Sequence, residues 1–177
     1  MVPIDLRFYS QLVLYSLRQN VWKIADFGVT SPGTSKGFYS TVFSRGTPSY
    51  RAPELLSASP HFNNKSDVWA LGCILYELLT GEKAFNGDWG VIQYTQPKSA
   101  LFNVPISKLV VVDLRDYAKQ KDVENWIRSM LDRDAEKRPP ALKVHEYFKN
   151  ILESLGLESL SGGKLPKREC TKLHSKV

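Results

Sequence analysis

The sequence predicts a single domain of mostly α fold. Three segments of the 177-residue chain carry apolar side chains at helical spacing, whereas one short segment near the beginning has strand composition. The hydrophobic share of 42% is close to the average for globular proteins, which excludes collagen-like, low-complexity and strongly charged disordered classes. A chain of this size buries roughly 70% of the surface that its unfolded form exposes, so one hydrophobic core is expected.

A short β-hairpin is expected near the beginning of the chain. The segment Val21–Ala25 has strand composition and follows the turn-prone pair Gln19-Asn20. Residues 30–49 then show no sustained apolar period and are rich in Ser, Thr, Gly and Pro. We expect these residues to form a long loop, and loops of that length inside a compact domain are usually functional or disordered.

Three helices account for most of the remaining chain. The first is expected between the cap-type residues Asn64–Ser66 and Gly81, and its apolar side chains lie nearly all round, which predicts a helix through the middle of the core. Asp122–Leu131 and Pro140–Leu155 have the pattern of amphipathic helices. Leu109–Val112 fits either a strand or a buried helical turn, and the pattern leaves both open.

The basic charge of the chain is concentrated at its end. The formal net charge is +6, and residues 161–177 hold five Lys or Arg against one Glu. We expect a solvated, flexible tail, and a frayed terminus is favoured over a segment that binds nucleic acid or acidic partners. Nucleic-acid binding ranks last because no aromatic platform or recognised module lies beside the basic residues.

The apolar runs and the cysteines of the sequence bear on membrane contact and on the cellular compartment of the protein. The longest apolar run, Val68–Leu79, contains Glu77 and is shorter than the roughly 20 residues that cross a bilayer, so no membrane contact is expected. Cys73 lies in an apolar segment and is expected to pack in the core, while Cys170 lies in the basic tail. Without metal or disulfide spacing, the two cysteines favour a reducing compartment, cytoplasmic or nuclear.

Four short motifs follow one another in a fixed order. They are Asp26-Phe27-Gly28, Gly46–Glu54 (GTPSYRAPE), Asp67–Gly72 (DVWALG) and Lys137-Arg138-Pro139. In this order they resemble the eukaryotic protein kinases of serine/threonine type, over about Val21–Phe148. The resemblance implies the helical C-terminal lobe of the protein kinase-like fold, with a short β-hairpin at its start and the N-terminal lobe absent.

The resemblance gives the residues after the hairpin a role at the phosphate-transfer site. It implies that Asp26 binds Mg²⁺, that Phe27 packs to set active and inactive states, and that Gly28 lets the backbone turn where the activation segment, residues 26–54, departs. Thr41 and Ser44 are the favoured phosphorylation sites within this segment, and an unmodified polar loop is an equal alternative.

The end of the activation segment resembles the substrate-docking loop of serine/threonine-specific kinases, with Thr47 and Tyr50 shaping the acceptor site. The resemblance further implies that Glu54 and Arg138, 84 positions apart, form a buried ion pair that ties the segment to the helical lobe. Asp67 binds backbone amides of the catalytic loop in such proteins, and it also suits the N-terminus of a helix. Both roles can hold together.

The chain departs from the kinase pattern before Asp26. In the shared register Phe8, Ser10 and Val13 stand where kinases have the proton-accepting Asp, a Lys and a metal-binding Asn, and only Arg7 agrees. Only 25 residues precede Asp26. The glycine-rich loop, the phosphate-anchoring Lys and the helix Glu of the N-terminal lobe are therefore expected to be absent from this chain.

These observations predict three parts and two possible functions. Residues 1–20 form an atypical segment in place of the catalytic loop, residues 21–157 the C-lobe, and residues 158–177 the basic tail. A complete parent protein is expected to transfer the γ-phosphoryl group of ATP, with Mg²⁺, to Ser or Thr of a protein substrate, whereas this chain alone is expected to be inactive. The alternative is a pseudokinase-like scaffold module that docks a protein partner through the helical lobe.

Overall fold

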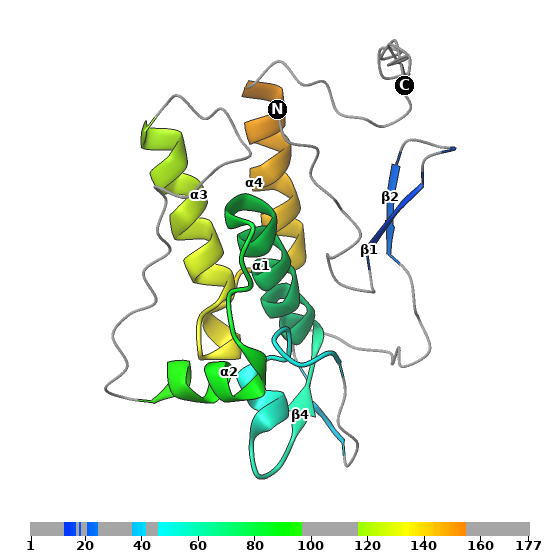
Figure 1. Ribbon diagram of the computed structural model, residues 1–177, viewed down its shortest axis with the longest axis vertical. Coiled ribbons are helices and arrows are strands. Elements are labelled where there is room, and N and C mark those ends of the chain that lie inside the picture. Colours follow the sequence, from blue (N-terminus) through cyan, green and yellow to red (C-terminus); the bar gives the residue numbers. More distant parts are fainter. Residues whose placement is uncertain are drawn as a thin grey trace, which may run out of the picture.

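The computed structural model is a helical assembly with a small amount of β structure (Figure 1). Helices α1 (Asn64–Thr80), α3 (Tyr117–Met130) and α4 (Ala141–Ser154) lie alongside one another, and α2 (Gly87–Thr95) lies across one end of the group. The residues that the structure describes are 13–16, 18, 21–24, 37–41, 46–96 and 117–154.

The hairpin and the mostly helical architecture are confirmed. Strand β1 (Val13–Ser16) pairs antiparallel with β2 (Val21–Ile24), and Val13 lies opposite Ile24. Helices α3 and α4 occupy the two amphipathic segments that the sequence predicts, although α3 begins at Tyr117, ahead of the expected start. The described part of the chain therefore has the fold class predicted from the apolar pattern.

Local sequence signals at both ends define helix α1. Asn63, rather than a residue of Asn64–Ser66, is the N-cap, because its backbone is extended and its side chain accepts a hydrogen bond from the helix. The Ser66 backbone N–H donates to the Asn63 side chain, and the Ser66 hydroxyl accepts from the Asn63 backbone N–H, which completes a capping box. The helix ends at Gly81, whose φ of +74° is the left-handed conformation that glycine adopts most easily.

Helix α1 passes through the hydrophobic core. Trp69 and Cys73 are almost completely buried, and Trp69 stacks on Phe85 with the ring centroids 5.3 Å apart. Cys73 is a free thiol, as expected of a packing residue. The helix is not buried on all sides, because Leu71 is 40% exposed.

A second strand pair joins the predicted loop to a segment for which the sequence predicts no element. Strand β3 (Tyr39–Ser40) pairs antiparallel with β4 (His61–Phe62), and the Phe38 ring packs edge-on against His61 with centroids 4.8 Å apart. The Thr41 backbone N–H extends the pairing by donating to the Pro60 carbonyl at 3.0 Å. A two-residue strand has no period of its own, so its partner about twenty residues away could not be inferred from the sequence.

Three further helical elements have no counterpart in the sequence prediction. They are α2, the 3-10 helix η2 (Pro53–Leu56) and the 3-10 helix η4 (Ala135–Lys137). Val91 is the one buried residue of α2, which explains why the segment lacks a helical period. Leu109–Val112 and the basic tail lie outside the described residues, and no described helix is long and apolar enough to span a bilayer.

Substitution of Gly72 by Ala tests the close contact between α1 and α3. A Cβ atom at Gly72 would lie 3.0 Å from Met130 Cβ and 3.1 Å from Leu131 Cδ2. We expect Gly72→Ala to lower the free energy of unfolding by about 1–3 kcal/mol because two packed side chains must move. Gly90→Ala is the matched control, since its nearest neighbour, Phe85, is at 3.4 Å. Urea denaturation should show no loss for the control, and equal losses would contradict the packing argument.

Candidate functional site

The segment Gly46–Glu54 folds back on itself at the surface of the helical lobe. Arg51 Nε donates to the Gly46 carbonyl at 2.8 Å, and the Tyr50 backbone N–H donates to the Thr47 carbonyl at 3.1 Å. The Thr47 side chain is exposed to solvent, whereas that of Tyr50 is buried. The loop therefore presents a short turn outward and anchors it through the aromatic residue beneath.

Tyr50 is anchored on helix α1. Its hydroxyl donates to Glu77 Oε2 at 2.5 Å, and both residues are buried. Burial, the hydrogen bond to Glu77 and the charge of that carboxylate all raise the pKa of Tyr50, so the phenol stays protonated and remains a donor at neutral pH. The Lys83 ammonium lies 5.9 Å from the centre of the Tyr50 ring.

Two further residues fix the loop to the start of α2. Ser49 has φ of +77°, a conformation that is costly for a residue with a side chain, and its Oγ accepts from the Gly87 backbone N–H at 2.9 Å. Arg51 Nη1 lies 2.6 Å from Asp88 Oδ2 in a partly buried ion pair. Sequence reasoning missed Ser49, Arg51 and Asp88, since no local pattern signals contacts with partners 37 or 38 positions away.

The structure brings Glu54 and Arg138 together. Arg138 Nη1 donates to Glu54 Oε1 at 2.7 Å and Nη2 donates to Oε2 at 2.8 Å, with both side chains almost completely buried. The guanidinium also donates to the Asp132 carbonyl and lies 5.0 Å from the Trp69 ring centre. The Ser66 hydroxyl donates to Glu54 Oε1 at 2.7 Å, so the buried charges are paired and hydrogen-bonded.

Lys65 joins the Glu54–Arg138 pair to the first turn of α1. Its carbonyl accepts from Arg138 Nη1 at 3.1 Å, and its ammonium donates to the Arg138 carbonyl. Burial acts to raise the pKa of Glu54. The hydrogen bonds and the positive charge of Arg138, together with the hydrogen bond from Ser66, outweigh this effect, so the pKa of Glu54 is lowered. Glu54 is therefore a carboxylate at neutral pH.

Asp67 lies in the first turn of α1, where its charge suits the helix dipole. Its side chain is exposed, and partial loss of its water shell raises its pKa. Among the described residues its carboxylate accepts no hydrogen bond. The catalytic-loop amides expected to bind it lie in the stretch before Val13, outside the described residues.

Several predicted site residues cannot be placed. Asp26, Phe27, Gly28 and Ser44 lie outside the described residues. Thr41 is described and is 8% exposed at the end of the β3–β4 pair. Within the described parts of the chain no group of three His, Cys, Asp or Glu side chains could hold a metal ion.

Comparisons with known proteins give the family. A family model for the protein kinase domain matches residues 10–148. The chain is 38% identical over 130 residues to the serine/threonine-protein kinase Nek8 of Danio rerio, covering 73% of this chain and 17% of that protein. It is 34% identical over 149 residues to the serine/threonine-protein kinase Nek4 of Mus musculus, and the match covers 82% of this chain and 17% of that protein. The chain belongs to the serine/threonine protein kinase family.

The kinase match is wider than the motifs alone indicate. It begins at residue 10, ahead of the expected Val21, and so includes both strands of the hairpin. A third similar protein, the serine/threonine-protein kinase nekl-2 of Caenorhabditis elegans, is 46% identical over 78 residues, which are 44% of this chain and 21% of that protein. The chain thus spans about a fifth of the length of these kinases.

Removal of Arg138 tests how strongly the buried pair holds the kinase lobe together. We expect Arg138→Ala to lower the free energy of unfolding by about 3–5 kcal/mol, because the Glu54 carboxylate would stay buried without its partner. Lys149→Ala is the control, since Lys149 lies 3.7 Å from Glu153 in an exposed pair worth about 0.5 kcal/mol. Thermal unfolding, monitored by circular dichroism, distinguishes the two variants. Equal Tm values for wild type and Arg138→Ala would contradict the prediction.

The pH dependence of stability offers a second test of the same pair. Because the pKa of Glu54 is lower in the folded than in the unfolded protein, the unfolded protein binds more protons at acid pH. The stabilisation that the Glu54–Arg138 pair gives to the folded protein is complete at pH values above 4.5, the ordinary pKa of a Glu side chain. It is lost as the pH falls below that value and Glu54 takes up a proton. Unfolding free energies from pH 7 to pH 3 should therefore fall less steeply for Glu54→Gln than for wild type. The exposed control Glu146→Gln should follow wild type, and a Glu54→Gln curve parallel to wild type would refute the assignment.

Proposed function

We propose that this chain supplies the substrate-docking lobe of a protein kinase that transfers the γ-phosphoryl group of ATP to Ser or Thr of a protein substrate. The observation that carries the proposal is the anchored loop Gly46–Glu54. Its exposed turn at Thr47 is attached to helices α1 and α2, and its far end is held by the buried pair of Glu54 with Arg138. Phosphoryl transfer depends on positioning more than on covalent chemistry, and a loop held in this way meets that need.

The loop supports substrate binding through its attachments. Tyr50 fixes its height above α1 through Glu77, while Ser49 and Arg51 fix its position against α2 through Gly87 and Asp88. The loop is thus held from two helices, and a substrate strand resting on Thr47 would meet a surface already in place. Less conformational freedom is then lost when the substrate binds.

Asp26 is the residue through which we propose that the kinase holds Mg²⁺. The family generally uses ATP and Mg²⁺, and a carboxylate oxygen is the ligand that this hard cation prefers. When bound, Mg²⁺ would neutralise charge on the phosphate oxygens during transfer. The chain's own contribution to the reaction is then the carboxylate of Asp26 and the orientation of the acceptor hydroxyl by the Gly46–Glu54 loop.

A pseudokinase-like scaffold is the second candidate, and one specific observation favours it. Phe8, Ser10 and Val13 stand in the places of the proton-accepting Asp, the Lys and the metal-binding Asn of the catalytic loop. A phenyl ring accepts no proton and a valine binds no metal. Under this proposal the helical lobe docks a protein partner and transfers no phosphate.

Asp26→Asn in the complete parent protein distinguishes the two proposals. With radiolabelled ATP, Mg²⁺ and a mixed Ser/Thr protein substrate, we expect the kinase to label the substrate and Asp26→Asn to lower the rate by about 100-fold or more, because a neutral amide holds Mg²⁺ poorly. The control Asp122→Asn removes an exposed carboxylate of α3 and should leave the rate unchanged.

The opposite results would favour the scaffold. A parent protein that labels nothing, and whose Tm does not respond to ATP with Mg²⁺, would contradict phosphoryl transfer. For this chain alone we expect no ATP-dependent shift in Tm, since the residues that cover ATP in kinases are not among its motifs.

A further inference from the structure

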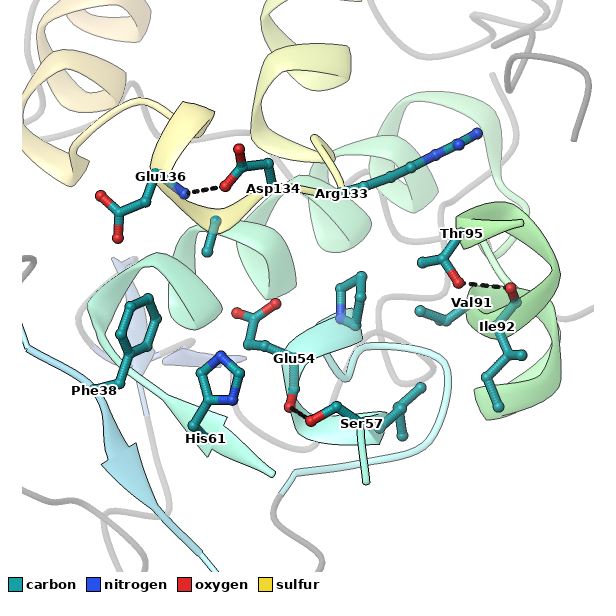
Figure 2. Close-up of a pocket in the computed structure, with 13 residues that line it drawn as sticks. Phe38, Glu54, Ser57, His61, Val91, Ile92, Thr95, Arg133, Asp134 and Glu136 are labelled. Carbon is teal, nitrogen blue, oxygen red and sulfur yellow. Dashed lines mark hydrogen bonds between the residues drawn. The ribbon is translucent and has the colours of Figure 1, made fainter. Parts of the chain in front are cut away.

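A pocket of about 550 Å³ lies at the end of the Gly46–Glu54 loop, where Pro53 and Glu54 line it (Figure 2). It is an open pocket lined by η2, whose first two residues are the last two of the loop, and by β4, α2 and η4, with Phe38 at one side. Its volume is within the range of sites that bind small molecules or peptide side chains. The side chains that give it an apolar wall are Phe38, Pro53, Leu56, Val91, Ile92 and Ala135.

The apolar wall continues onto exposed surface at both sides. Phe38 is 45% exposed, and Trp89 on α2 is 66% exposed. Trp89 and Ile92 are three residues apart in the helix and therefore lie on the same face. Large aromatic side chains beside a concave apolar site are typical of surfaces that bind another polypeptide.

The rim of the pocket is acidic although the whole chain carries a net charge of +6. Asp134 and Glu136 are exposed at η4, and Glu136 takes part in no ion pair among the described residues. Asp134 is 3.7 Å from Lys137 Nζ in a largely exposed pair, which screens it only weakly.

Among the described residues that line the pocket, Arg133 is the one Lys or Arg, and it contacts residues outside the acidic rim. The Arg133 guanidinium lies 5.0 Å from the centre of the Tyr94 ring, and Nη1 donates to the Gln96 carbonyl at 3.3 Å. Figure 2 shows its side chain extended away from Asp134 and Glu136. Since the charge of Glu54 is matched by Arg138, two carboxylates remain to attract a cation to the rim.

We propose that this pocket docks a short segment of a protein substrate that carries a bulky apolar side chain next to Lys or Arg. The apolar side chain fills the space between Leu56 and Ile92, and the basic residue lies against Asp134 and Glu136. Because η2 begins within the Gly46–Glu54 loop, such a substrate is held at a second point beside the loop that receives its hydroxyl. The identification of the partner as a substrate rests on the proposed function, whereas the peptide chemistry rests on the pocket alone.

Three fluorescein-labelled dodecapeptides test the proposal with this chain, by fluorescence anisotropy and without ATP. One has a central Leu-Phe pair flanked by Lys and Arg, the second has the same pair flanked by Asp and Glu, and the third keeps the basic flanks but replaces Leu-Phe by Ser-Ser. We expect the first to bind at least about tenfold more tightly than either of the others. Equal affinities of all three would overturn the proposal.

Matched variants locate the binding. Ile92→Asp should weaken binding of the basic Leu-Phe peptide by about tenfold or more, whereas Leu142→Asp, at a 67% exposed position of α4, should leave it unchanged. Glu136→Lys should weaken binding of the basic peptide and strengthen that of the acidic one, while Glu146→Lys, the same change on α4, should do neither. Glu136 is exposed, so its variant reports on charge without the loss of a packed side chain.

Other outcomes of these experiments would also decide whether the pocket docks such a peptide. Binding that is unaffected by both Ile92→Asp and Glu136→Lys would place the peptide elsewhere and overturn the proposal. Self-association in ultracentrifugation that Ile92→Asp abolishes would show that a second copy covers the pocket, which also overturns it. Since peptide binding is measured without nucleotide, a parent protein that transfers no phosphate would contradict the proposed function and leave this result standing.

Discussion

The buried ion pair of Glu54 with Arg138 is the interaction on which the other parts of the site depend. Two charges removed from water are stable only when each is paired and its other hydrogen-bonding atoms are satisfied, and here Ser66, Lys65 and the carbonyl of Asp132 complete the set. Glu54 lies in η2, Ser66 and Lys65 lie in the first turn of α1, and Asp132 lies in the segment before η4. The pair thus joins η2 and the start of α1 to Arg138, which is 84 positions from Glu54.

Helix α1 carries both the core and the loop. Its buried face holds Trp69, which stacks on Phe85 on one side and lies under the Arg138 guanidinium on another. Near its end Glu77 accepts the hydroxyl of Tyr50. The same helix therefore determines where the hydrophobic core lies and how high the Gly46–Glu54 loop stands above it. A displacement of α1 would be transmitted to both.

Local features were predictable from the sequence, and contacts between distant segments were not. The helices α1, α3 and α4 repeat their apolar residues over several turns, and Gly81 ends α1 where a left-handed residue is needed. In contrast, β3 has two residues and α2 one buried position, so neither has a readable period. The pairing of Glu54 with Arg138 came from resemblance to kinases rather than from spacing. The strained Ser49 has no signal in the sequence at all, since serine rarely adopts positive φ.

The short pairing of β3 with β4 has a kinetic consequence for Thr41. Its side chain is almost enclosed and its backbone N–H donates to the Pro60 carbonyl, so an enzyme that modified this hydroxyl would reach it only in molecules whose strand had separated from β4. The modification rate would then follow the population of this open form and not the abundance of the enzyme alone. A phosphate added there could not return to the enclosed position without losing its water shell, so the strand would stay open after the event. The two residues of β3 would in this way be paired with β4 in the unmodified chain and separated from it once Thr41 carried a phosphate.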